Sequence, residues 1–162
     1  MNHKKKRKGI RSGNPICPYC GSHTVLRSAD GIYIDNSRDE MLYVCKNYPA
    51  CDAYVRVQKG TTLPLGVMAN RQLRELRAEA HRQFDKLYKH GYMSKADAYQ
   101  WLGGVLGCPQ ERAHIGQLNV LSCQLVIREA KNQIAWYHKK NQQKRKEMRK
   151  HDGTDQSTTA EG

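Results

Sequence analysis

The sequence lacks a long apolar run. Of its 162 residues, 38% are hydrophobic, but no stretch of about 18 consecutive apolar residues occurs, so a membrane-spanning helix is not expected. The basic residues that open the chain are followed by no apolar segment, so a secretory signal peptide is not expected either. Both absences predict a cytoplasmic protein whose cysteines stay reduced.

Acidic residues are missing from residues 1–13, which hold six Lys and Arg, and residues 136–151 hold one acid beside seven Lys and Arg. Residues 14–62 hold five basic and five acidic residues, so this segment is neutral before any metal binds. Basic runs contact phosphates irrespective of sequence, although lysine-rich ends also keep small proteins soluble. The net charge of +13 therefore predicts a nucleic-acid partner, with DNA favoured over RNA.

Four of the six cysteines form two close pairs with 24 residues between them: Cys17 and Cys20, then Cys45 and Cys51. A C-x2-C turn presents two thiolates to one ion, and four thiolates form the tetrahedral site that zinc favours. A disulfide framework is the alternative for an even cysteine count, but paired cysteines in a reducing compartment favour a metal. Free buried thiols would leave the close pairing unexplained. We therefore expect one structural Zn2+ per chain.

Composition divides the chain into four segments. Residues 1–14 are expected to be a disordered basic arm, and residues 15–60 a zinc ribbon. Residues 61–138 are expected to be a helical domain, and residues 139–162 a basic helical extension with a disordered tail. The predicted fold class is α+β, with a small four-cysteine zinc ribbon followed by a three-helix domain.

The period of the apolar residues changes between the two halves of the chain. In the ribbon, runs of β-branched and aromatic residues predict strands at 24–27, 31–34, 41–44 and 53–57. In the second half, apolar residues recur every three or four positions and predict three helices. Their expected N-caps are Asn70, Ser94 and Asn119, and the third helix is expected to continue into the basic run 139–150.

The segments around the two cysteine pairs carry a resemblance. Tyr43-Val44-Cys45 is followed by Asn47-Tyr48-Pro49 before Cys51, and the first pair reads Cys17-Pro18-Tyr19-Cys20-Gly21. Residues 15–57 thereby resemble the zinc ribbons at the C-terminal end of type IA topoisomerases. The resemblance implies a ribbon that meets single-stranded nucleic acid. It does not imply topoisomerase activity, because nothing in the chain resembles the catalytic domains.

A ribbon displays aromatic rings on its sheet, and bases stack on such rings at about 1–3 kcal/mol each. Tyr33 and Tyr54 are the favoured platforms, because Tyr43 and Tyr48 are expected to cover the zinc site. The candidate phosphate contacts in the ribbon are Arg27, Arg38, Lys46, Arg56 and Lys59. Those at the ends of the chain are Lys4, Lys5, Lys6, Arg7, Lys8, Lys139, Lys140, Lys144, Arg145 and Lys146.

The helical half carries a second resemblance. Its segments are Leu63-Pro64-Leu65-Gly66, Leu73-Arg74-Glu75-Leu76-Arg77 and Ala98-Tyr99-Gln100-Trp101-Leu102. Together with the ribbon, these segments resemble a family of small zinc-finger-containing proteins of bacteriophages and prophages. The resemblance implies a phage or mobile-element origin and a bacterial host cell, but no particular activity.

A catalytic constellation is not evident in the sequence, so the protein is not expected to be an enzyme. His81 and Asp85 are four residues apart on one expected helix face, and with His114 they leave a second metal or catalytic site as an alternative. Polar residues in such places are commonly engaged in hydrogen bonds instead. Cys123 lies on the apolar stripe of the third helix and is expected to be a small core residue.

The favoured hypothesis is a non-enzymatic, zinc-dependent nucleic-acid-binding protein. The ribbon would contact single-stranded or junction DNA, or RNA, and the basic ends would hold the backbone phosphates. The alternative is a phage-encoded protein-interaction module. Such a module would bind a host nucleoprotein, for instance a defence effector or a polymerase, and inhibit or redirect it.

Overall fold

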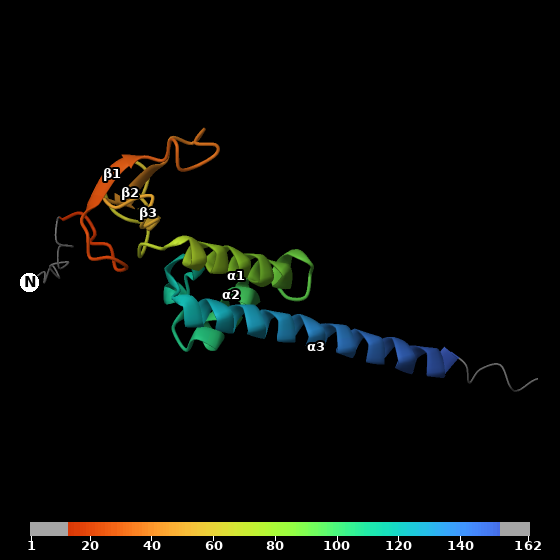
Figure 1. Cartoon of the computed structure of the whole chain (residues 1–162). Helices are drawn as coiled ribbons and strands as arrows, with labels where there is room; N and C mark the ends of the chain where they lie inside the picture. The colour runs from red at the N-terminus through yellow and green to blue at the C-terminus, as the bar shows by residue number, and fades with distance from the viewer. Residues whose placement is uncertain (1–12, 153–162) are drawn as a thin grey trace, which may run out of the picture. The chain divides into compact units, whose positions relative to one another are not determined.

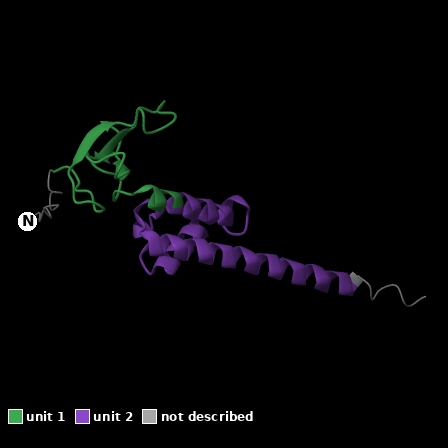
Figure 2. Ribbon diagram, viewed as in Figure 1, with its two compact units in different colours: residues 1–75 green, residues 76–162 purple. Residues whose placement is uncertain are grey.

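The computed structural model describes residues 13–152. Within this range the elements are β1 (Thr24–Ser28), β2 (Met41–Cys45), β3 (Tyr54–Arg56), α1 (Arg71–Lys89), α2 (Lys95–Leu106), the short 3-10 helices η1 (Gln110–Arg112) and η2 (Ile115–Gln117), and α3 (Val120–Asp152) (Figure 1). The chain divides into two compact units, residues 1–75 and residues 76–162 (Figure 2). The predicted α+β class is confirmed. No helix in the described range combines the length and the apolar character needed to cross a membrane.

The three strands form one antiparallel sheet with β2 in the centre. The register pairs Tyr43 of β2 with Leu26 on one side and with Val55 on the other, so these three side chains share one face. This face packs with Cys45 and Met68 into a buried cluster. Tyr43 is buried there, and its hydroxyl donates to the carbonyl of Thr62 at 2.9 Å.

The strand predicted at 31–34 is wrong, because this segment turns back on itself. The carbonyl of Ala29 accepts hydrogen bonds from the amides of both Ile32 and Tyr33, at 3.0 and 2.9 Å. The side chain of Asn36 then donates to the hydroxyl of Ser28 and to the carboxylate of Asp30. These local bonds use the polar groups that a strand ladder would need, as side chains of this type commonly do in turns.

The segment after β3 pairs with the ribbon instead of leaving it. The amide of Leu65 donates to the carbonyl of Arg56 at 2.8 Å, and Tyr54 and Ala69 exchange two backbone hydrogen bonds of 3.0 and 3.2 Å. Met68 is buried against the sheet. These residues all lie in the first compact unit, which runs to residue 75.

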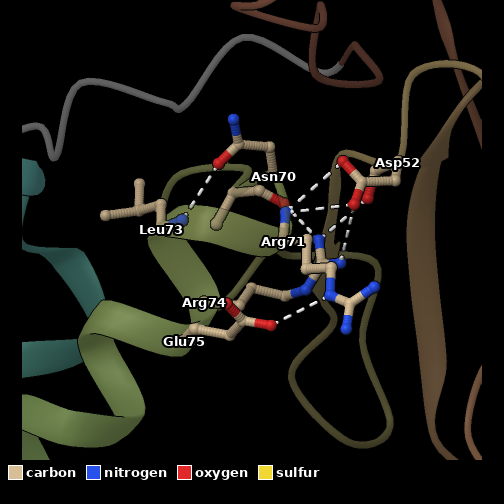
Figure 3. Close-up of polar contacts among 7 residues, drawn as sticks. Asp52, Asn70, Arg71, Leu73, Arg74 and Glu75 are labelled. Carbon is tan, nitrogen blue, oxygen red and sulfur yellow. Dashed lines mark hydrogen bonds and ion pairs between the residues drawn. The ribbon is translucent and has the colours of Figure 1, made fainter.

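The first turn of α1 is fixed by polar contacts, which Figure 3 shows. The side chain of Asn70 caps the helix as predicted, by accepting from the amide of Leu73 at 3.0 Å. The carboxylate of Asp52 accepts from the amide of Arg71, the first residue of the helix, at 3.2 and 3.3 Å. An anion at a helix N-terminus also interacts favourably with the helix dipole.

The second unit has a small aromatic core. Phe84 of α1 is fully buried, and its ring meets Tyr99 edge-on at 5.1 Å between centroids and stacks on Trp101 at 6.5 Å. The predicted N-cap of α2 is confirmed, because the hydroxyl of Ser94 accepts from the amide of Asp97. Gly107 ends α2 in the left-handed conformation.

The last helix, α3, continues far beyond this core. The side chain of Asn119 caps it by accepting from the amide of Ser122 at 2.9 Å, as predicted. Cys123, Val126 and Ala130 are buried, which confirms the predicted stripe. From His138 to His151 every side chain is exposed, so the basic run continues α3 as an exposed helix.

Candidate metal centre

The four cysteines lie on two tight turns beside the sheet. In the first turn, the amide of Gly21 donates to the carbonyl of Cys17 at 2.9 Å, and Gly21 has a φ of 71° that favours glycine. In the second, Cys45 ends β2 and its carbonyl accepts from the amide of Tyr48, while the amide of Cys51 donates to the carbonyl of Asn47. Each turn therefore points two thiols in one direction.

The sulfur atoms have the spacing of a tetrahedral site. All four Sγ atoms lie within 4.8 Å of one another, with 3.3 Å between those of Cys20 and Cys45 and 3.6 Å between those of Cys17 and Cys51. A tetrahedron with metal–sulfur bonds of about 2.3 Å has edges of about 3.8 Å. None of the described cysteines forms a disulfide. The residues therefore fit a zinc ion held by four thiolates.

Hydrogen bonds and burial act on the thiols in opposite directions. Bonds from the hydroxyl and the amide of Ser22 lower the pKa of the Cys20 thiol to about 6. Burial raises the pKa of the Cys45 thiol to about 12. A divalent cation deprotonates the thiols that coordinate it, and the amide of Asn47 near Cys45 supports the resulting thiolate. The side-chain amide of Asn47 also donates to the sulfur of Cys20 at 3.6 Å.

The residues of the alternative second site are not brought together. Within residues 13–152, the four cysteines are the only group of three or more potential metal ligands. The carboxylate of Asp85 accepts from the hydroxyl of Tyr88 at 2.8 Å and from Lys89 at 2.6 Å. His81 is exposed on α1 and acts on Asp85 electrostatically, while His114 is exposed between the two 3-10 helices.

Four of the predicted nucleic-acid contacts lie on one face of the sheet. The register aligns Arg27, Leu42 and Arg56 in one row across the three strands, and it aligns Val44 with Tyr54 in the next row of that face. The ring of Tyr33 packs on the same face, edge-on to Tyr54 at 6.0 Å. We call this surface the tyrosine face, and it consists of Arg27, Tyr33, Leu42, Val44, Tyr54 and Arg56.

The two predicted platforms on the tyrosine face are partly covered. Burial raises the pKa of the Tyr33 phenol, as expected for a ring that is half removed from water. The guanidinium of Arg74 lies 3.9 Å from the centroid of the Tyr54 ring. Arg56 contacts the carboxylate of Glu40 at 3.4 Å, and Arg27 donates to the carbonyl of Asp30. The surface is therefore a packed mixture of rings and guanidinium groups.

The remaining predicted contacts are all exposed where the structure describes them. Arg38, Lys46 and Lys59 lie in loops of the ribbon, outside the row of the tyrosine face. Five candidates lie on the exposed part of α3, namely Lys139, Lys140, Lys144, Arg145 and Lys146. Five others, Lys4, Lys5, Lys6, Arg7 and Lys8, lie outside the described residues.

Sequence reasoning missed Arg74. Its guanidinium donates to the carbonyls of Asp52 and Ala69 at 2.8 and 2.6 Å, approaches the Asp52 carboxylate at 3.4 Å, and covers Tyr54. The sequence did contain a signal for it, since Arg74 lies in the first turn of α1, where a cation interacts unfavourably with the helix dipole. Such a residue indicates a partner outside its own helix.

A four-thiolate site beside a three-stranded antiparallel sheet defines a small zinc-finger domain. The chain matches the family model of the zinc-finger-containing domain DUF3268 over residues 14–133, and it belongs to that family. The matched region includes all four cysteines, the sheet, α1, α2 and the first part of α3. No curated protein and no solved structure matches the chain significantly.

Proposed function

We propose that the protein is a zinc-dependent nucleic-acid-binding protein without catalytic activity. The observation that carries the proposal is the exposed end of α3. Residues 136–151 carry seven Lys and Arg against one acid, and the side chains from His138 to His151 are exposed on a continuous helix. An exposed helix that bears this charge is well suited to the backbone of a polyanion.

The tyrosine face supports single-stranded or junction nucleic acid as the partner, with DNA favoured over RNA. Unpaired bases stack on guanidinium planes as well as on aromatic rings. Arg74 on Tyr54 therefore extends the surface for stacking, while Arg27 and Arg56 at its edges suit phosphates. The resemblance of residues 15–57 to topoisomerase ribbons supports the same partner.

The proposed cofactor is one zinc ion per chain, held by Cys17, Cys20, Cys45 and Cys51. Its proposed role is structural, because it joins the two turns that flank the sheet. The resemblance of the helical half to phage and prophage proteins supports a phage origin, with the cytoplasm of the bacterial host as the place of action.

Binding of labelled single-stranded DNA, duplex DNA and RNA across a range of salt concentrations tests the proposal. We expect single-stranded DNA to bind most tightly and the logarithm of affinity to fall linearly with the logarithm of salt. Replacing Lys139, Lys140, Lys144, Arg145 and Lys146 by Gln should lower that slope by up to about 0.7 for each phosphate that the variant no longer neutralises.

The control for charge is a variant in which Lys89 and Lys95, away from the basic run, are replaced by Gln. It should keep most of the affinity and of the salt dependence. Two results together would contradict a specific nucleic-acid-binding function. The protein would bind all three polymers weakly and equally, and each variant would lose affinity in proportion to the number of charges removed.

A second candidate is a module that binds a host nucleoprotein and inhibits or redirects it. The loop after β3 favours it, because Leu63, Leu65 and Val67 are exposed by 44%, 42% and 56%. Replacing these three residues by Ser separates the two functions. Loss of binding to host proteins with unchanged DNA affinity would favour the interaction module.

A further inference from the structure

The helical unit contains a groove with a cationic lining. The groove has a volume of about 480 Å³ and lies between the C-terminal half of α1, the following loop, and α3. Its polar lining residues are Gln83, Lys86, His90, Tyr92, Lys131 and His138. Among the described residues, no acidic side chain lines it. A groove with donors on several sides and no carboxylate favours an anionic ligand.

The two lysines of the groove are not neutralised by ion pairs. Among residues 13–152, neither Lys86 nor Lys131 lies within ion-pair distance of a carboxylate. Lys86 donates to the side-chain oxygen of Gln83 at 3.2 Å. Lys131 interacts electrostatically with Glu79, but that carboxylate already accepts hydrogen bonds from Arg82 and Gln83.

The aromatic part of the groove lining consists of Tyr92, His90 and His138. The hydroxyl of Tyr92 and Nε2 of His138 are hydrogen-bonded at 3.0 Å. The ring of Tyr92 stacks on that of Tyr137, with 5.6 Å between their centroids. The centroid of the His90 imidazole lies 6.2 Å from that of the Tyr92 ring. The contacts with Tyr92 position the imidazole of His138 before a ligand arrives, which reduces the entropy lost on binding.

We propose that this groove binds a phosphate group, supplied by the backbone of the nucleic acid. The proposal rests on the proposed function and adds a site that the basic run of α3 does not include. Lysine, imidazole and amide groups all donate to phosphate oxygens, and two lysines without ion pairs match the charge of adjacent phosphodiesters. The residues that α3 contributes to the groove are Lys131, Ile134, Ala135 and His138. In the sequence they are recognisable only by their spacing of three or four residues, which places them on one helix face.

The site is tested by replacing Lys86 and Lys131 together by Gln. The matched control replaces Lys89 and Lys95, which belong to the same helical unit but do not line the groove. The probe is a labelled oligothymidylate titrated at several salt concentrations. We expect the groove variant to bind at least about fivefold more weakly and its salt slope to fall by about 1.4, while the control stays within about twofold of the unmodified protein. Equal losses of affinity in the two variants would overturn the proposal.

A second readout separates failure of the groove from failure of the proposed function. Inorganic pyrophosphate is titrated while the imidazole signals of His90 and His138 are followed by NMR. We expect saturable shifts that disappear in the groove variant and persist in the control.

If these shifts occur but no oligonucleotide binds, the phosphate site stands and nucleic-acid binding fails. If oligonucleotides bind but neither the shifts nor the variant effect appears, the groove proposal fails alone. Displacement of pyrophosphate by polyglutamate at similar concentration would also overturn it, because the groove would then accept any anion.

Discussion

At the scale of single residues, Arg74 shows how one side chain can determine a local arrangement. Its guanidinium binds two carbonyls and approaches a carboxylate, and its flat face lies on Tyr54. The planar, five-donor geometry of arginine allows these interactions at the same time. Neighbouring Arg71, in contrast, is exposed, and its side chain forms an i,i+4 ion pair with Glu75.

We expect Arg74→Ala to destabilise the first unit by about 2 kcal/mol, because the variant removes charged hydrogen bonds and a cation–π interaction together. Hydrogen exchange of the paired amides of Tyr54 and Ala69 would measure the change. Arg71→Ala is the matched control and should change stability by less than about 0.5 kcal/mol. Similar exchange rates in the two variants would show that Arg74 does not hold this region.

The cysteines give a second prediction at this scale. We expect the unmodified protein to contain one zinc ion per chain, and Cys20→Ser to lower zinc occupancy because a hydroxyl is a poor substitute for a thiolate ligand. Metal analysis of purified protein measures this. Cys108→Ser is the control, since Cys108 lies outside the four-cysteine cluster and should leave zinc content unchanged. Full occupancy in the Cys20→Ser protein would mean that Cys20 is not a ligand.

At the scale of elements, the end of α2 depends on two adjacent glycines with different surroundings. A Cβ added to Gly103 would lie 2.9 Å from the backbone carbonyl oxygen of Cys108. A Cβ added to Gly104 would have no described atom within 4 Å, apart from its chain neighbours and the adjacent backbone of its own helix. The amide of Cys108 also donates to the carbonyl of Gly103 at 3.0 Å. Of these two glycines, only Gly103 therefore lacks space for a side chain.

We expect Gly103→Ala to destabilise the helical unit by about 1–3 kcal/mol, because the backbone at Cys108 must move. Gly104→Ala should stabilise the unit by about 0.5–1 kcal/mol through its higher helix propensity. Thermal unfolding followed by far-UV circular dichroism compares the two variants. If both alanine variants had a higher melting temperature, the backbone at Cys108 would be able to move away from residue 103 at little cost.

At the scale of the whole molecule, the two compact units differ in what stabilises them. The first unit has a three-stranded sheet and the cluster of thiols, whereas the second has a core of packed helices that includes Phe84, Leu87 and Leu102. Small β domains with few core residues commonly depend on their metal. The helical unit contains no such group of ligands in the described part of the chain.

Removal of the metal by a chelator should therefore unfold the ribbon and leave most of the helical signal. NMR signals of β2 and β3 would collapse, while far-UV circular dichroism would keep its helical minima. Return of the ribbon signals on addition of zinc, but not of magnesium, is the expected control, because magnesium disfavours thiolate ligands. Simultaneous loss of both units would mean that they are not independent in stability.

The sequence by itself determined the features that depend on local spacing. The spacing of two close cysteine pairs predicts the four-cysteine cluster. Residue type and the period of the apolar residues predict the helix caps at Asn70, Ser94 and Asn119. Residues 31–34 are predicted as a strand because they are rich in β-branched and aromatic residues. Hydrogen bonds from Asn36 and to the carbonyl of Ala29 determine a turn instead.

Tertiary structure alone decided which residues share a surface. The tyrosine face depends on the register of three strands, the cover of Tyr54 depends on where α1 begins, and the cationic groove brings together residues 86 and 131 from different helices. Local propensity carries no information about such pairings, because they are determined by long-range packing and by closure of the chain between distant segments.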